Sequence, residues 1–253
     1  LGTNTVGGLQ ITTTATSNIG LGANAVNSIT TGDNNVGLGD DSLTAVTTGA
    51  TNTAVGVGSG SLITTGSHNI AIGFASLDAT TTGGDNTSIG SYALSANTTA
   101  SYNTAVGRKT LFTNTTGADN VAIGVFSLQN NTTASNNTAV GGYALTANTT
   151  GANNTSLGRS ALAANTTGAS NVALGSQALY TNTTGQQNTA TGLGAMYLNT
   201  EGDYNTAVGY TALRNNTTAD NNTAVGYRAM RETTTGANNT GIGYYALNAN
   251  TTG

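Results

Sequence analysis

The chain has 253 residues and a formal net charge of −4, and only 6% of its residues are charged, against about 25% in ordinary soluble domains. It contains no cysteine, which excludes a disulfide framework and a thiolate metal site. Its six lysines and arginines are too few and too scattered for nucleic-acid binding, and no apolar run approaches the roughly 18 residues of a membrane-spanning helix.

The chain divides into two segments by its repeats. Residues 1–17 match the rest of the chain least well and are predicted to be a diverged first coil or a partial cap. From residue 18 to residue 253 the sequence repeats with a period of seventeen, and Gly22 recurs as fourteen evenly spaced glycines ending at Gly243. A period this strict, without insertion or deletion, predicts that each repeat is one coil of a stacked backbone.

One repeat gives the expected fold of every coil. With Asn18, Asn35 and their successors as position 1, the consensus is N-T-A-V-G-x-x-A-L-x-x-N-T-T-G-x-x, seen almost whole in residues 205–221. Glycines at positions 5 and 15 and the β-branched residues around them disfavour helices. Segments such as Thr206–Val208 and Asn216–Thr218 are predicted strands, with glycines at the corners. The sequence therefore predicts an all-β fold, a parallel β-solenoid (β-roll) of about fifteen 17-residue coils.

Side-chain character indicates which positions face inward. Nearly all charged residues fall at positions 6, 7, 10, 16 and 17, so these positions are predicted to face solvent. The aliphatic residues at positions 4 and 9 are predicted to form the internal ladder. A coil with alanine at positions 3 and 8 is thin and buries little apolar surface, so we expect association into a homotrimer or an end-to-end filament. The predicted structural ladder, taken from one repeat, comprises Asn103, Val106, Gly107, Leu111, Thr115 and Gly117.

The two asparagine columns have alternative interpretations. At position 1, stacked side-chain amides can hydrogen-bond from coil to coil, or they can form a ligand surface. At position 12, the asparagine opens an N-T-T triplet, a formal glycosylation acceptor. Early copies place Val46 and Ile63 at position 12, however, which favours an inward-facing amide ladder over a row of glycans.

Candidate binding chemistry is sparse. Adjacent threonines at positions 13 and 14 suggest ice binding, but ice-binding rows need threonines at i and i+2 to share a face. His68 has no repeated acid or nucleophile beside it, and the aspartates lack the spacing of calcium-binding repeats, so no catalytic, cofactor or metal site is predicted. Exposed tyrosines gather in the C-terminal third, where they either form an adhesive surface that stacks on sugars or on a neighbouring subunit, or pack along the outer face of the β-ribbon. The candidate adhesive surface comprises Tyr204, Tyr210, Tyr227, Tyr244 and Tyr245.

The N-T-A-V-G-x-x-A-L and N-T-T-G blocks resemble the head repeats of trimeric autotransporter adhesins of the YadA-like type, and are similar to repeats of long phage tail-fibre proteins. The resemblance covers residues 18–253, although the coils of the adhesin heads are somewhat shorter. It implies a homotrimeric parallel β-roll on a cell surface or a virion, with a cell-surface glycan or a host receptor as partner.

These observations together predict a structural, extracellular fibre or filament segment that serves attachment and has no enzymatic activity. The alternative is an ice- or glycan-binding β-solenoid that acts through one flat face.

Overall fold

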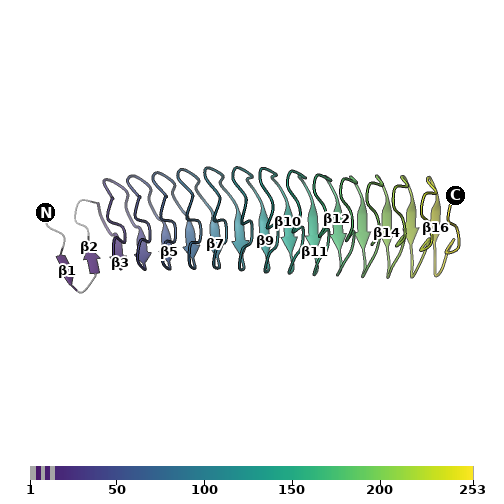
Figure 1. Cartoon of the computed structure of the whole chain (residues 1–253), viewed down its shortest axis with the longest axis horizontal. Helices are drawn as coiled ribbons and strands as arrows, with labels where there is room; N and C mark the ends of the chain where they lie inside the picture. Colours follow the sequence, from purple (N-terminus) through teal and green to yellow (C-terminus); the bar gives the residue numbers. More distant parts are fainter. Residues whose placement is uncertain (1–3, 7–8, 12–14, 253) are drawn as a thin grey trace. The chain divides into compact units, whose positions relative to one another are not determined.

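The computed structural model describes residues 4–6, 9–11 and 15–252, and its regular elements are all β-strands. Fourteen parallel strands form a β-solenoid of about thirteen turns, with about 17 residues in each coil. The predicted fold class is therefore confirmed, with somewhat fewer turns than the fifteen coils counted in the sequence. Figure 1 shows the strands in chain order.

The N-terminal segment contains a hairpin instead of a parallel strand. β1 (Asn4–Val6) pairs antiparallel with β2 (Leu9–Ile11), and β2 pairs antiparallel with β3 (Ile19–Leu21), the first strand of the solenoid. A coil would have placed a parallel strand along β3. Residues 1–3, 7–8 and 12–14 lie outside the described residues, so the assignment of residues 1–17 as a diverged coil or partial cap stays a prediction.

The chain forms two compact units, Leu1–Val125 and Phe126–Gly253. In both, each solenoid strand occupies positions 2–4 of its repeat and pairs with the same positions of the next repeat, as in Thr206↔Thr223. The first unit also contains β4 (Val36–Leu38), β5 (Thr53–Val55), β6 (Ile70–Ile72), β7 (Thr87–Ile89), β8 (Thr104–Val106) and β9 (Val121–Ile123). The second contains β10 (Thr138–Val140), β11 (Thr155–Leu157), β12 (Val172–Leu174), β13 (Thr189–Thr191), β14 (Thr206–Val208), β15 (Thr223–Val225) and β16 (Thr240–Ile242).

The strands bury position 3 and turn positions 2 and 4 outward. Ala105 is fully buried in β8, whereas Val106 beside it is half-exposed. The prediction that position 4, including Val106, lines the interior is therefore wrong. Successive strand residues point to opposite faces, and the interior beside the strand has room for only a small side chain. A Cβ added to Gly37, at position 3, would lie 2.7 Å from Cγ2 of Val26.

The core lies between the strands and the position-9 side chains. Leu111 and its equivalents from Val26 to Met230 are fully buried, as predicted, and the small residues at position 8 are buried beside them, whereas Leu247 of the last coil is exposed. Gly107, at position 5, has a φ of +133°, and a Cβ there would lie 2.8 Å from the carbonyl carbon of Gly124. The corner that ends each strand therefore requires glycine, as the sequence suggested.

Three other positions of the coil adopt left-handed backbone, and in most coils they hold residues other than glycine. Gln177, Leu179 and Gln187, at positions 7, 9 and 17, have φ values of 58°, 51° and 55°. Each donates its backbone N–H to a carbonyl of an adjacent coil at 3.0 Å, which offsets the strain of this conformation. Residues 216–218 are not a strand, contrary to prediction: the Asn216 N–H turns back to the carbonyl of Leu213 in the same coil.

Candidate functional surfaces

The position-1 asparagines form a continuous buried ladder within each unit. Asn103 donates its backbone N–H to Oδ1 of Asn86 at 3.0 Å, and its own Oδ1 accepts the backbone N–H of Asn120 at 3.1 Å. Its Nδ2 donates to the carbonyl oxygen of Gly117 at 3.0 Å. Because Asn103 is fully buried and its amide bonds to the coils above and below, it holds the corner of the coil, as the structural interpretation predicted.

The position-12 asparagines form a second buried ladder. Nδ2 of Asn165 donates to Oδ1 of Asn148 and to the carbonyl oxygen of Gly168, both at 2.9 Å. Val46 and Ile63 are fully buried at the same position in the first unit. The prediction that position 12 faces inward is confirmed, and in the folded coil these amide nitrogens are inaccessible to a glycosyl donor.

The threonines at position 13 link the coils from the outside. The hydroxyl of Thr183 donates to the carbonyl oxygen of Thr200 at 3.0 Å, and Thr98 makes the same bond to Thr115 at 3.2 Å. These side chains are half-buried, whereas their neighbours at position 14 are exposed. The two rows therefore do not share a face, in agreement with the argument against ice binding at positions 13 and 14.

Thr183→Val should lower the free energy of unfolding by about 1 kcal/mol, because the substitution removes one inter-coil hydrogen bond at constant side-chain shape. Urea unfolding followed by circular dichroism measures the change. Thr184→Val, one residue later at an exposed position, is the control and should change stability by less than about 0.5 kcal/mol. Equal effects of the two substitutions would contradict a structural role for the Thr183 hydroxyl.

The outer face of the strands is charge-free in both units. We call this surface the strand face; it consists of positions 2 and 4 of the solenoid repeats. Position 4 is aliphatic in every coil except at Thr191, and Leu157 leaves 52% of its surface exposed. This face differs from the prediction, in which the aliphatic residues of position 4 line the interior. The signal available was the small residue that always precedes them.

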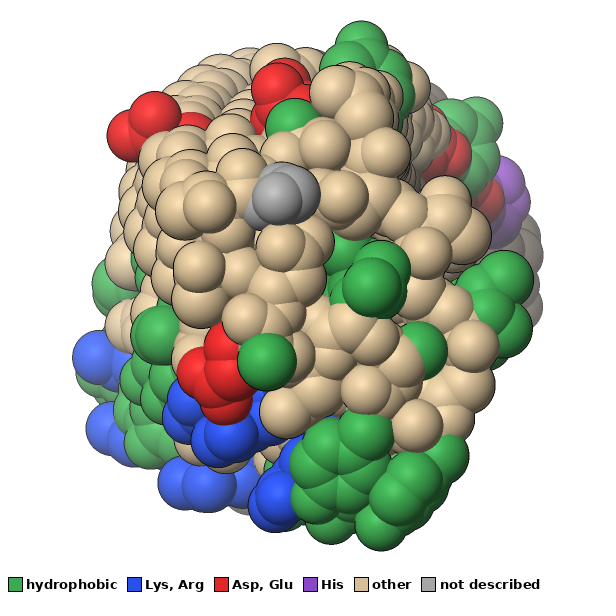
Figure 2. Space-filling model, turned by 90° about the vertical axis from the view of Figure 1, so that its right-hand side faces the viewer, with side chains coloured by type: hydrophobic (Ala, Val, Ile, Leu, Met, Phe, Trp, Pro, Cys, Tyr) green, Lys and Arg blue, Asp and Glu red, His purple; other side chains and the backbone are tan. Residues whose placement is uncertain are grey.

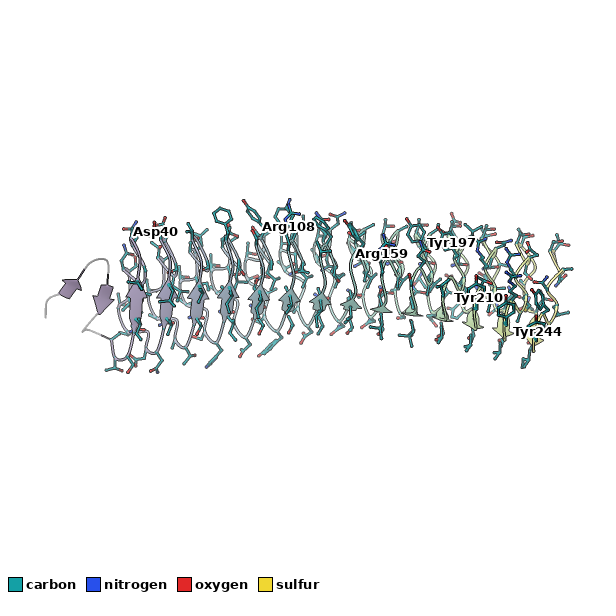
Figure 3. All side chains as sticks on the ribbon, turned by 90° about the horizontal axis from the view of Figure 1, so that it is seen from below. Asp40, Arg108, Arg159, Tyr197, Tyr210 and Tyr244 are labelled. Carbon is teal, nitrogen blue, oxygen red and sulfur yellow. The ribbon has the colours of Figure 1, made fainter. Side chains whose placement is uncertain are left out.

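Four of the five predicted adhesive tyrosines lie together in the second unit. Tyr210, Tyr227 and Tyr244, all at position 6, stack with ring centroids 5.3 and 5.4 Å apart, and Tyr245 contacts the last two. Tyr204 lies on the other side of its strand, at position 17, and no ring contact joins it to the others among the described residues. Figure 3 shows Tyr197 and Tyr210 on the outside of neighbouring coils.

An arginine and a second ring stack accompany these tyrosines. The Arg228 guanidinium lies 5.2 Å from the Tyr227 ring and donates to the Tyr245 hydroxyl at 2.8 Å. That hydrogen bond raises the pKa of Arg228. Tyr180 and Tyr197 also stack, at position 10; this pair is absent from the predicted surface although the two rings occupy the same position of successive repeats. Because the rings within each stack cover one another's faces, their edges and hydroxyl groups are what a partner can reach.

The described residues contain no cluster of metal-ligating side chains, no pocket, and no helix long and apolar enough to cross a membrane. The surfaces open to a partner are thus the strand face, the tyrosine stacks and the charged positions beside them. Comparisons with family models, with characterised proteins and with solved structures found no match for this chain.

Proposed function

We propose that this chain is the shaft segment of a structural, extracellular fibre that serves attachment, and that its copies associate side by side through the strand face, as a homotrimer. The observation that carries the proposal is the exposed aliphatic column at position 4, repeated in coil after coil without a charge. Isolated exposed apolar side chains are normal on soluble proteins, but a contiguous apolar strip of this kind marks an interaction site.

A second copy of the chain suits this strip better than an unrelated partner. Both copies would present the same side chains at the same coil spacing of about 4.8 Å, so contacts made at one coil are repeated at the next. The seven coils of each unit make a strip about 30 Å long. A stable interface buries about 800 Å² of surface on each partner, so the contact would have to run along the whole strip. The thin core also supports association with a second copy, because small residues at positions 3 and 8 leave much of the aliphatic surface of each coil unburied.

The attachment role rests on the repeat resemblance and on the tyrosines. A glycan or host receptor is the proposed ligand of the surface formed by Tyr210, Tyr227, Tyr244 and Tyr245. Tyr244, with 76% of its surface exposed, ends the position-6 stack of the described residues. Sugar rings stack on aromatic faces, and the faces of Tyr227 are already covered by its neighbours, so hydroxyl edges would make most of the contact.

Ice binding remains the second candidate, through the strand face and not through positions 13 and 14. Positions 2 and 4 satisfy the i and i+2 requirement. In the second unit, position 2 is threonine in six coils out of seven: Thr138, Thr155, Thr189, Thr206, Thr223 and Thr240. A flat row of threonine beside a row of aliphatic residues is a surface that could order water.

The mass of the protein in solution separates the two candidates. Light scattering coupled to gel filtration should give about three times the 24.9 kDa chain mass, and electron microscopy should show rods. The same sample should leave ice recrystallisation unchanged, because association covers the strand face. A monomer that inhibits ice growth would overturn the fibre proposal in favour of ice binding, and an inactive monomer would overturn both.

A further inference from the structure

Charged side chains are segregated on the two sides of the strand face. Positions 6 and 7, which follow each strand, carry Arg159 and Arg228 in the second unit and no acid; we call them the basic flank. Positions 16 and 17, which precede each strand, carry Asp203 and Asp220 and no cation; we call them the acidic flank. Figure 2 shows the blue side chains gathered on one side and most of the red ones on the opposite side at the end that faces the viewer.

In the second unit, no ion pair among the described residues joins Arg159 or Arg228 to Asp203 or Asp220 within one chain. Ion pairs join His68 to Asp85 and Arg231 to Glu232, and neither pair joins the two flanks. Asp203 and Asp220 instead accept backbone N–H groups of the preceding coil, from Gln186 at 2.7 Å and from Asp203 at 2.8 Å. Such bonds fix the position of the carboxylates at the edge of the strand face.

Packing two strand faces together brings the flanks of the two copies into contact. When the copies run parallel, the basic flank of one lies against the acidic flank of the other. When they run antiparallel, each flank meets its own kind. Opposite charges attract across the first arrangement, and in the second unit like charges would repel across the other arrangement.

In one coil of the second unit the opposite charges also flank the same strand. Asp220 precedes β15 and Arg228 follows it, so in-register packing places Arg228 of one copy beside Asp220 of the next. In the first unit, Arg108 and Lys109 follow β8, whereas Asp119 precedes β9, so these charges lie one coil spacing out of register.

Two other coils differ in what the same packing would bring together. Tyr204 and Tyr210 precede and follow β14 and are both exposed, so the same packing brings their rings together. The coil of β4 opposes this packing, because Asp33 precedes the strand and Asp40 and Asp41 follow it, which would bring carboxylates of two copies together.

We infer that copies of this chain bind each other basic flank to acidic flank, parallel and in register, with Arg228 of one copy paired to Asp220 of the next. The inference deepens the proposed fibre function and rests on it. The contact is heterologous, because each copy uses two different surfaces, and it closes into a ring around the buried strand faces. The ion pairs at the rim set orientation and register, while the strand face supplies most of the affinity.

Cross-linking tests the orientation, because the chain has no cysteine of its own. Ser170 precedes β12 on the acidic flank and Ser176 follows it on the basic flank. The doubly substituted chain, with Ser170→Cys and Ser176→Cys, should give covalent oligomers with a short bis-maleimide reagent, whereas each singly substituted chain should stay uncoupled. Coupling in the singly substituted chains, or none in the doubly substituted chain while it is still assembled, would overturn the inference.

Charge reversal tests the ion pair itself. Arg228→Glu and Asp220→Lys should each weaken association about tenfold at low salt, and the chain with both reversals should recover wild-type association. Glu201→Lys and Arg214→Glu, at positions 14 and 10 away from the flanks, are controls with the same changes in net charge. If the double reversal fails to recover association, the inference is wrong; if the unsubstituted chain is a monomer, the fibre proposal itself has failed.

Discussion

Lysine at Leu157 and Val208 should convert the assembly into folded monomers. Both residues are at position 4 of the second unit, half-exposed in the single chain and central to the proposed contact. In the assembled state the two ammonium groups would be buried against aliphatic side chains, and an unpaired buried charge costs several kcal/mol. We expect association to weaken by at least about a hundredfold, which corresponds to about 2.7 kcal/mol.

Folding of the single chain should survive these substitutions, because both side chains point to solvent. Circular dichroism should therefore stay strand-rich while the mass from light scattering falls to that of one chain. Thr167→Lys and Thr218→Lys provide the control, since they add the same charge in the same two coils at exposed position 14. An assembly that tolerates lysine at Leu157 and Val208 as well as it tolerates the control would rule out the strand face as the interface.

The architecture could be predicted from the period alone. A short repeat of fixed length without insertion is compatible with stacked coils of equal size. The strand Thr206–Val208 could be predicted from its β-branched residues. The inward position of Leu111 followed from its apolar character and its recurrence. The asparagine ladders followed from the same argument, because identical amides stacked at one coil spacing can satisfy each other.

The orientation of position 4 could not be obtained from hydrophobicity. Val106 is more apolar than Ala105, yet Ala105 is the buried residue, because the strand alternates and the coil is narrow. The useful signal was size: position 3 holds only glycine, alanine or serine, as at Gly37 and Ser88. A volume limit of this kind marks a close approach, whereas a position that accepts valine, leucine, isoleucine and threonine has open space beside it.

The corners were only partly predictable. The recurring glycine at position 5 indicates a backbone conformation that other residues avoid. Positions 7, 9 and 17 also adopt left-handed conformations, but with ordinary side chains such as Leu179. Nothing in a leucine indicates a positive φ, and the conformation is imposed by hydrogen bonds between coils. The ring stacks could be predicted in part. Recurrence at the repeat period places Tyr210 next to Tyr227 on successive coils, but only the structure shows that the two rings cover each other's faces.

Asn188→Ala should lower the free energy of unfolding by about 2–4 kcal/mol, although it removes no apolar side chain and touches no proposed interface. Asn188 is fully buried, and its Oδ1 accepts the backbone N–H of Asn205 at 2.9 Å. Its Nδ2 donates to the carbonyl oxygen of Gly202 at 2.7 Å. Alanine would leave the Asn205 N–H without this acceptor in a dry corner, at a cost of about 1–3 kcal/mol, and would add a small cavity.

The measurement needs a background in which folding is separate from assembly, which the chain with lysine at Leu157 and Val208 should supply. Urea unfolding of that monomer, with and without Asn188→Ala, gives the difference in stability independently of protein concentration. Asn130→Ala is the matched control, because it makes the same chemical change at an exposed site and should cost less than about 0.5 kcal/mol. Equal losses for the two substitutions would mean that the ladder does not hold the coils. A larger loss for Asn188 would mean that coil-to-coil amides, and not the thin aliphatic core alone, keep the solenoid folded while its aliphatic face stays free for a second copy.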